Sequence, residues 1–368
     1  MSRTNLRRSL ALAATGALMI GSLAACGGGG NSSGGNASAT GGGNGSSGKA
    51  GKIALLLPES KTTRYESFDR PYFEAKVKEL CANCQVVYSN ADQDTSKQQQ
   101  QAEAALTEGV NVMVLDPVDS TAAASITNSA KSQGVPVIAY DRFIKGAPID
   151  YYISFDNVKV GELQGSALVD KLKADGKTSG NLLMINGSPT DNNAGQFKQG
   201  AHSVLDSSGF KVAAQYDTPD WSPDKAQSWT DGQLAQSKDI VGVYAANDGT
   251  AGGAIAAMKA SGMNPLPPVT GQDAELAAIQ RILVGDQYMT VYKAIKPEAE
   301  KAAELAVALV NGEKPTVPDK VEGIPSVLLK PVAVTKDNIK DTVIADKFYT
   351  VDQICTADYA QACKSAGL

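Results

Sequence analysis

Histidine is nearly missing from this sequence, since His202 is the only one in 368 residues. A metal site built on several histidines is therefore excluded, and histidine-based acid–base chemistry would depend on a single side chain. His202 lies in a stretch with helical periodicity, which favours a place on a helix surface over a catalytic role. The Gly-x4-Gly-Lys-Ser/Thr phosphate loop and the His-Glu-x-x-His helix are also missing. Recognised catalytic signatures are therefore missing from the sequence. We expect a protein that is not an enzyme and that uses no cofactor or metal.

Neither sign of charge is in large excess. There are 34 Lys and Arg against 39 Asp and Glu, a net charge of −5, and removal of a leader containing three arginines would leave 31 − 39 = −8. Nucleic acid is not an expected partner, because its phosphates are bound by clustered Lys and Arg. The contents of 42% hydrophobic and 20% charged residues are typical of globular proteins, and the length suits two domains.

Long apolar runs are scarce. The run from Leu10 to Ile20 is shorter than the ~20 residues that a membrane-spanning helix needs. It follows a basic start and precedes Leu-Ala-Ala-Cys26, which predicts a secretion signal over residues 1–25. The tetrapeptide resembles the bacterial lipobox, which implies cleavage before Cys26 and lipid attachment to its sulfur. Ordinary signal cleavage beside a chance cysteine is the alternative.

Residues 26–51 consist mainly of Gly, Ser, Asn and Ala, with Lys49 as their only charge. Such a segment has too little apolar area to offset its chain entropy, so we expect a flexible tether. The folded body would then lie outside the cytoplasm, held at the cell membrane by lipid on Cys26.

Four cysteines remain: Cys81, Cys84, Cys355 and Cys363. Three pairings are possible, and disulfides persist outside the cytoplasm. A redox-active Cys-x-x-Cys needs its first cysteine at a helix N-terminus, whereas Cys81 ends a helical stretch. We therefore expect structural disulfides between sequence neighbours, with the second pair stapling a C-terminal tail over residues 351–368.

From Lys52 onward, short β-rich runs alternate with longer stretches of helical period. This alternation predicts an α/β protein with parallel sheets wound by helices, and about ten strands suggest two sheets. The expected strands are Ile53–Leu57, Gln85–Ser89, Val110–Leu115, Val135–Tyr140, Tyr151–Phe155, Leu182–Ile185, Lys211–Tyr216, Ile240–Ala245, Val269–Gly271 and Tyr288–Tyr292.

Polar residues gather directly after these runs, and ligands of doubly wound sheets bind beyond the carboxyl ends of the strands. They include Pro58-Glu59, Asp116-Pro117, Asp141-Arg142, Asp156-Asn157, Asn186-Gly187, Asp191-Asn192-Asn193, Asn247-Asp248, Gln272-Asp273 and Lys293. Asp and Asn before a helix are also the preferred N-caps, which is the simpler explanation for Asn157, Asp191, Asp248 and Asp273. Arg142 and Lys293 do not fit that explanation.

Several motifs follow one another between Lys52 and about Phe348: AYDR at 139–142, YISFDN at 152–157, GSPTDNNA at 187–194, NDGTAGGA at 247–254, GQDA at 271–274 and TVYK at 290–293. Together they closely resemble the D-xylose-binding branch of the type I periplasmic sugar-binding proteins of bacterial ABC transporters. The resemblance implies two Rossmann-like, doubly wound domains joined by a three-segment hinge, with a sugar between them. The domains would comprise residues 52–155 plus about 294–326, and 156–293 plus about 327–350.

The resemblance also assigns ligand contacts. The matching positions are Arg64, Asp141, Arg142, Asp191, Asn193, Asn247, Asp273 and Lys293. Trp221 matches a tryptophan that would cover one face of the sugar, with Phe155 or Tyr65 a candidate for the other. Tyr65 stands where the xylose-binding proteins have a tryptophan, so the stacking surface is altered there. The three aspartates among these residues balance Arg64, Arg142 and Lys293, which suits a neutral ligand.

The expected function is capture of a neutral monosaccharide, with D-xylose favoured, and its delivery by a lipid-anchored monomer to the permease of an ABC importer. One alternative is a sugar sensor that docks on a chemoreceptor or sensor kinase. Another is a binding protein for a different aldose, such as glucose, ribose or arabinose. A sugar-modifying enzyme is the third.

Overall fold

The computed structural model describes residues 49–237 and 239–368. The predicted signal over residues 1–25, the lipid-attachment residue Cys26 and the tether up to residue 48 lie outside the described residues. In the described part of the chain, no helix combines the length and the apolar character that crossing a membrane requires.

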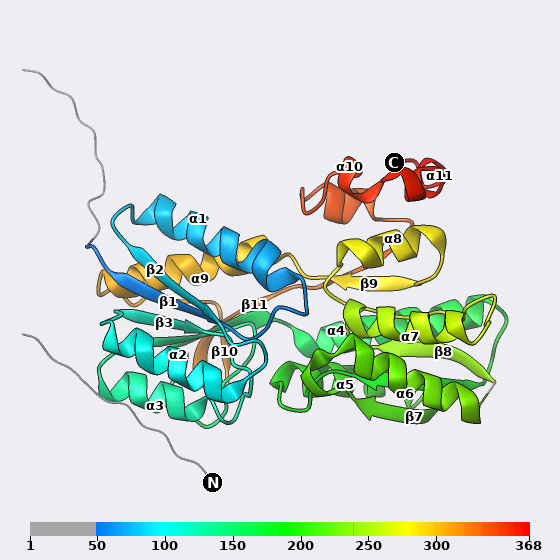
Figure 1. The fold of residues 1–368 in the computed structure, drawn as a ribbon, viewed down its shortest axis with the longest axis horizontal. Helices are drawn as coiled ribbons and strands as arrows, with labels where there is room; N and C mark the ends of the chain where they lie inside the picture. Colours follow the sequence, from blue (N-terminus) through cyan, green and yellow to red (C-terminus); the bar gives the residue numbers. More distant parts are fainter. Residues whose placement is uncertain (1–48, 238) are drawn as a thin grey trace, which may run out of the picture. The chain divides into compact units, whose positions relative to one another are not determined.

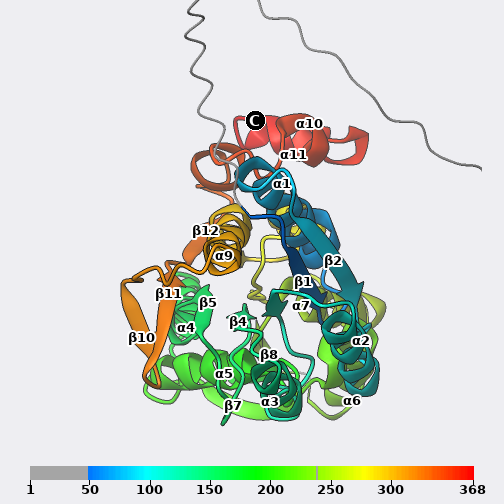
Figure 2. The same cartoon turned by 90° about the vertical axis from the view of Figure 1, so that its left-hand side faces the viewer.

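Seven strands form the first sheet, in the order β10-β11-β5-β4-β3-β1-β2 (Figures 1 and 2). Neighbours run parallel except β10 and β11, which are antiparallel at one edge. The strands are β1 (Lys52–Leu57), β2 (Gln85–Asn90), β3 (Val112–Leu115), β4 (Val137–Tyr140), β5 (Tyr151–Phe155), β10 (Asp319–Val321) and β11 (Ile324–Leu329). Central strands such as β3, with the sequence VMVL, are buried throughout, as expected for a parallel sheet covered on both faces.

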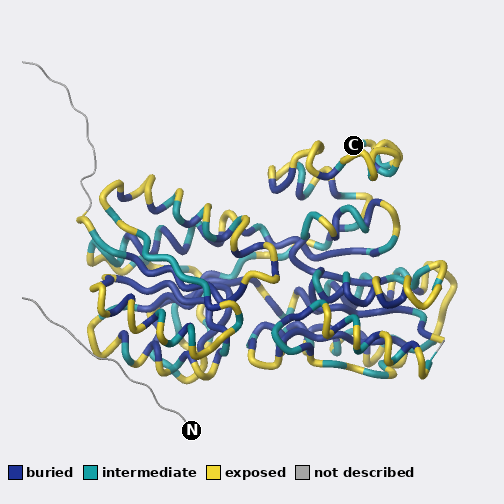
Figure 3. Tube along the Cα trace, viewed as in Figure 1, coloured by how far each residue is buried: buried dark blue, intermediate teal, exposed yellow. Residues whose placement is uncertain are grey.

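Helices cover both faces of this sheet. On one face lie α1 (Arg70–Leu80) and α9 (Ile295–Val310), and on the other α2 (Thr95–Thr107) and α3 (Ala124–Ser132) (Figure 1). The sheet and these four helices are called the first lobe below. The buried strands between the two helix layers form its core (Figure 3).

The second lobe is built on β6 (Asn181–Asn186), which lies parallel to and between β7 (Lys211–Asp217) and β8 (Ile240–Ala245). Beyond β8, β9 (Met289–Tyr292) pairs antiparallel with β12 (Val332–Thr335). Its helices are α4 (Asn157–Ala174), α5 (Asn192–Leu205), α6 (Pro223–Gln236), α7 (Asp248–Ala260) and α8 (Leu276–Val284). The pair α4 and α5 packs on one side of the sheet, and α6 and α7 on the other (Figure 1).

The chain passes between the two lobes three times: after β5, after β9, and between β11 and β12. The third passage lies after Leu329, beyond the boundary expected near residue 326, because β11 pairs with β5 of the first sheet. The expected strand Val269–Gly271 is wrong. Val269 makes a single bridge to Val243, and the chain then turns toward Asp273.

The chain ends in a helical tail with α10 (Val351–Ile354) and α11 (Ala360–Ser365), which packs against α8 (Figure 1). Gln280 of α8 donates a hydrogen bond to the carbonyl of Ile354 at 3.2 Å. A disulfide joins Cys355 to Cys363 within the tail, as the sequence predicted.

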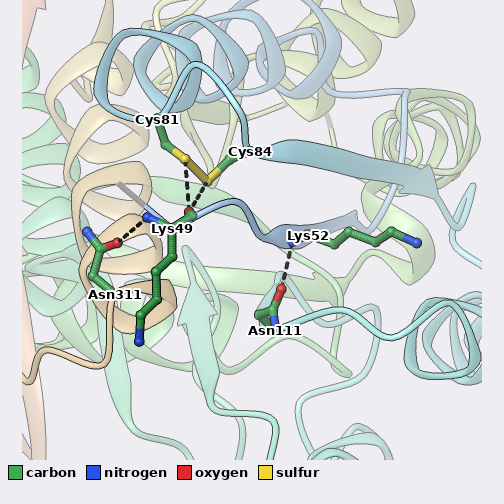
Figure 4. The surroundings of a disulfide bond; sticks show 6 residues. All are labelled: Lys49, Lys52, Cys81, Cys84, Asn111 and Asn311. Atoms are coloured by element: carbon green, nitrogen blue, oxygen red, sulfur yellow. Dashed lines mark hydrogen bonds between the residues drawn. A yellow bond between two sulfur atoms is a disulfide. The ribbon is translucent and has the colours of Figure 1, made fainter. Parts of the chain in front are cut away.

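The second disulfide, Cys81–Cys84, closes the turn between α1 and β2, also as predicted. Figure 4 shows that it lies against the first described residues: the carbonyl oxygen of Lys49 is 3.5 Å from the sulfur of Cys81 and 3.7 Å from that of Cys84. The backbone N–H of Lys52 donates to Asn111 at 2.8 Å in the same region. The disulfide thus packs on the segment that leads into β1.

Candidate functional site

A small polar cavity lies where the carboxyl ends of strands from both lobes meet. Residues from both lobes and from the passage after β9 line it: Thr62, Arg64, Tyr65, Asp141, Arg142, Asp191, Asn193, Phe197, Trp221, Asn247, Gln272, Asp273 and Lys293. This is the place that the doubly wound topology provides for a ligand.

Two of the lining residues are also helix caps. Asp191 precedes α5 and accepts a hydrogen bond from the N–H of Asn193 at 2.8 Å. Asn247 precedes α7 and forms a capping box with Thr250. The capping interpretation and the cavity interpretation therefore both hold for Asp191. For Asp248 and Asn157 the caps are instead the preceding residues, Asn247 and Asp156.

Asp141 and Asp273 hold their side chains in the cavity on unusual backbone, with φ of +55° and +93°. L-residues seldom adopt this region, so surrounding contacts must hold it. The carbonyl of Asp141 accepts from Ser154 at 2.6 Å and from Asn193 of the second lobe at 3.0 Å. The N–H of Asp273 donates to Val291 at 2.9 Å.

The first-lobe wall is an ion-pair network centred on Arg64. Its guanidinium forms a two-pronged contact with Asp69 at 2.9 and 2.7 Å, and it also donates to Glu298 at 2.7 Å and to Asp141 at 3.1 Å. Burial would raise the pKa of Asp141, but Arg64 and its cationic neighbours hold it well below its usual value. Burial raises the pKa of Glu298 to about 8, against the pull of Arg64. Asp141 is thus ionised in this network.

Tyr65 joins this network through its hydroxyl, not only through its ring. The hydroxyl donates to Asp141 at 3.1 Å and accepts from Arg142 at 3.1 Å. Both oxygens of Asp141 are therefore engaged by protein donors, because the other accepts from Arg64.

The lobes contact each other across and around the cavity. Arg142 Nε lies 3.0 Å from Asp191, and Lys293 Nζ lies 3.2 Å from Asp273 and 3.7 Å from Asp141. On the rim, the N–H of Ser120 donates to the carbonyl of Thr190 at 3.0 Å. These contacts describe a closed arrangement of the two lobes.

Three buried acceptor oxygens on the second-lobe side of the cavity have no hydrogen-bond donor among the described residues: Asn193 Oδ1, Gln272 Oε1 and Asp273 Oδ1. Lys293 pairs with Asp273 by charge but not with hydrogen-bond geometry. Buried polar atoms without partners cost free energy, so each calls for a donor from a ligand or water. The cavity therefore suits a ligand that carries several donors, such as hydroxyl groups.

Aromatic rings complete the wall, with one correction to the sequence-based expectation. Trp221 lines the cavity and donates from Nε1 to Asp191 at 3.1 Å. Phe155 does not line it, because its ring packs with Tyr292 and Ile295 and lies 5.4 Å beneath the ammonium of Lys293. The second-lobe partner of Trp221 is Phe197, whose ring meets it edge to face at 6.3 Å.

Sequence reasoning missed four residues of the site: Thr62 and Phe197 line the cavity, and Asp69 and Glu298 lie buried behind it. Gln272, which lines the cavity, and Asp116, which lies behind it, are among the polar residues noted after the expected strands. Phe197 follows Asn193 by four residues on α5, so helical spacing could have found it. Within residues 49–237 and 239–368, no cluster of His, Cys, Asp or Glu is arranged to hold a metal ion.

Comparison with known proteins agrees with this geometry. The family model described as "Periplasmic binding protein domain" matches residues 53–314. The D-xylose-binding periplasmic protein of Escherichia coli is 41% identical over 83% of this chain and 93% of its own length. A multiple sugar-binding periplasmic receptor of Rhizobium radiobacter is 35% identical over 72% of this chain and 81% of its own.

Among solved structures, an ABC transporter solute binding protein from Clostridium phytofermentans with bound β-D-glucose is similar, with a TM-score of 0.75 and 30% identity. The match covers 82% of this chain and 99% of that one. The motifs, the two wound sheets and these matches lead to one conclusion: the chain belongs to the periplasmic binding protein family, a family of binding proteins and not of enzymes.

Proposed function

We propose that this protein captures a neutral monosaccharide, D-xylose in the first place, in the cavity between its lobes and delivers it to an ABC importer. The observation that carries the proposal is the set of unpartnered acceptors on Asn193, Gln272 and Asp273, in a cavity that guanidinium and ammonium groups also line. Sugar hydroxyls donate and accept at the edge of the ring, so they fit both sides of such a cavity.

The charges support an uncharged ligand. Arg64, Arg142 and Lys293 line the cavity together with three aspartates, and further carboxyl groups lie behind them. Burial raises the pKa of Asp116 well above its usual value, which favours its neutral form. A sugar phosphate would add negative charge to a wall whose three cations are already balanced by aspartates, so we expect it to be rejected.

Binding of a monosaccharide with a Kd of about 1 μM requires that the protein bury nearly all of the ligand. Binding near 1 μM corresponds to about 8 kcal/mol. Over the roughly ten heavy atoms of a pentose this is about 0.8 kcal/mol per atom, which requires nearly complete burial. The closed arrangement supplies it, since the lining residues Asp141, Asn193 and Lys293 are each at most 3% exposed.

A thermal-shift screen tests the ligand class, because a ligand that binds only the native state raises the melting temperature. We expect the largest rise with D-xylose, smaller rises with glucose, ribose or arabinose, and none with a pentose phosphate. No rise with any neutral monosaccharide would reject the proposal. Recovery of chemically altered sugar after incubation would instead indicate an enzyme.

The relative described as a multiple sugar-binding receptor favours a second candidate, a sensor with a broader sugar range. Comparable thermal shifts for several aldoses, together with docking on a receptor in place of a permease, would favour it.

The membrane anchor is a separate part of the proposal and rests on Cys26 and the residues before it. In cells that process lipoproteins, we expect the full chain in the membrane fraction and a Cys26→Ser variant outside it. Equal partition of the two would reject lipid anchoring and leave sugar binding unaffected.

A further inference from the structure

A buried carboxylate lies directly behind the loop that carries Gln272 and Asp273. Asp248, the first residue of α7, is fully buried and is not part of the cavity wall. Its Oδ2 accepts from the N–H of Glu275 at 2.9 Å and from the hydroxyl of Thr290 at 2.9 Å. Its Oδ1 accepts from Gln287 at 2.7 Å.

The loop needs such support because of its backbone. Asp273 and Ala274 both have positive φ, at +93° and +53°, which L-residues keep only where surrounding contacts fix them. The N–H of Ala274 donates to the hydroxyl of Thr290 at 3.2 Å, so this hydroxyl links Asp248 to the loop. The N–H of Asp248 itself donates to the carbonyl of Gln272 at 2.9 Å.

The carboxylate also packs against the start of the loop. A Cβ placed on Gly271 would lie 2.0 Å from Asp248 Oδ1, so only glycine leaves room there for the side chain. Asp248 thus contacts the loop before, within and after the two residues that line the cavity.

We propose that Asp248 is a positioning residue for sugar binding: it acts through Thr290 and the backbone of Glu275 to hold Gln272 and Asp273 in the cavity. This inference rests on the proposed function, because the position of these two side chains matters for affinity only if they meet the ligand.

An amide cannot replace the carboxylate, although it has the same shape. In the Asp248→Asn variant, an NH₂ group at the position of Oδ2 would face the N–H of Glu275. An NH₂ group at the position of Oδ1 would instead face the NH₂ of Gln287, and Gln287 cannot turn over because its oxygen accepts from Arg281 at 3.0 Å. Each orientation of the amide sets a donor against a donor.

The test compares Asp248→Asn and Thr290→Val with the control Thr230→Val. Thr290 and Thr230 are both fully buried threonines of the second lobe, and Thr230 donates only within α6, to Ala226 at 2.7 Å. Hydrogen exchange of the ligand-free protein reports on residues 271–276, and calorimetry with D-xylose reports on affinity. We expect faster exchange in this segment and about tenfold weaker binding in both test variants. The control should change neither by more than about twofold.

Each outcome supports or overturns the inference. If Asp248→Asn does not fold, the comparison of Thr290→Val with Thr230→Val is the test. Exchange within about twofold of the control, or faster exchange with unchanged affinity, would overturn the positioning role. If the unmodified protein binds no monosaccharide, the proposed function fails, and the exchange measurement still shows whether Asp248 orders the loop.

Discussion

The indole ring of Trp221 fills the space beside the backbone of Gly187. A Cβ placed on Gly187 would lie 1.9 Å from the ring carbon Cη2 of Trp221, far inside van der Waals contact. Gly187 follows β6 and Trp221 follows β7, so two neighbouring strand ends of the second lobe fix this wall of the cavity. The absence of a side chain at residue 187 therefore sets where the ring can lie.

Gly187→Ala should displace the ring and weaken monosaccharide binding about tenfold or more, with about 1–3 kcal/mol loss of stability from overpacking. Calorimetry and denaturant unfolding measure the two effects. The control is Gly195→Ala, because a Cβ at that position of α5 meets nothing within 4 Å. The Gly195→Ala variant should keep its affinity for the monosaccharide, and its free energy of unfolding should rise by up to about 1 kcal/mol. Unchanged affinity in Gly187→Ala would show that the ring does not meet the ligand.

The intrinsic fluorescence should report ligand binding through one of the two tryptophans. Trp221 lines the cavity, whereas Trp229 stacks on Tyr216 at 5.5 Å, outside it. Trp221→Phe should therefore remove most of the sugar-induced change and weaken binding only modestly, while Trp229→Phe should retain the change. The reverse pattern would place the cavity wall elsewhere.

Arg142→Lys should weaken binding at least about tenfold, because one ammonium cannot replace a guanidinium that makes contacts in several directions. Arg142 pairs with Asp191, donates to Tyr65 at 3.1 Å and donates to the carbonyl of Pro117 at 3.2 Å. Arg70→Lys, at an arginine 39% exposed outside the cavity, is the matched control. Equal affinities of the two variants for the monosaccharide, measured by calorimetry, would show that Arg142 does not contribute to binding.

Much of the cavity could be predicted from the sequence because parallel strands present their carboxyl ends together. Asp141 and Arg142 directly follow β4, and Lys293 directly follows β9, so reading the residues after each strand found them. Phe155, the alternative to Tyr65, is not among the residues that line the cavity, because a residue at a strand end can point to either face. Its side chain belongs to the apolar cluster formed with α8, β9 and the C-terminal tail.

The carboxyl groups behind the cavity wall could not be predicted from the sequence for a different reason. Glu298 lies 234 residues from Arg64, and only the folded chain brings them together. It stands among Ile295, Ala299 and Ala302 on the buried face of α9, where an isolated carboxylate is costly. A charged residue on an otherwise apolar helix face thus indicates that Glu298 has a buried partner, but the sequence does not show that this partner is Arg64.

Stability should fall as pH rises from about 5 to about 8 in the ligand-free protein. Burial raises the pKa of Glu275 and that of Glu298 to about 8. The folded state then binds protons that the unfolded state has released, so each group lowers the unfolding free energy by up to about 1.4 kcal/mol per pH unit in this window. The lowered pKa of Asp141 acts in the opposite direction, but only at more acidic pH.

Denaturant unfolding over this pH range measures the effect, and Glu298→Gln should make the dependence shallower because it removes one of the titrating groups. Stability that rises steadily from pH 5 to pH 8 would contradict the assignment of these two carboxyls as proton-binding groups in the folded state.

The most direct test of the account is a calorimetric titration of the protein and its Asp273→Ala variant with D-xylose. Asp273 is 5% exposed, pairs with Lys293 at 3.2 Å, and presents an acceptor that no described protein donor satisfies. The account predicts one sugar bound per chain in the unmodified protein, and no detectable binding in a variant that remains folded. Absence of heat with the unmodified protein, or equal affinity in the variant, would contradict a monosaccharide site between the lobes.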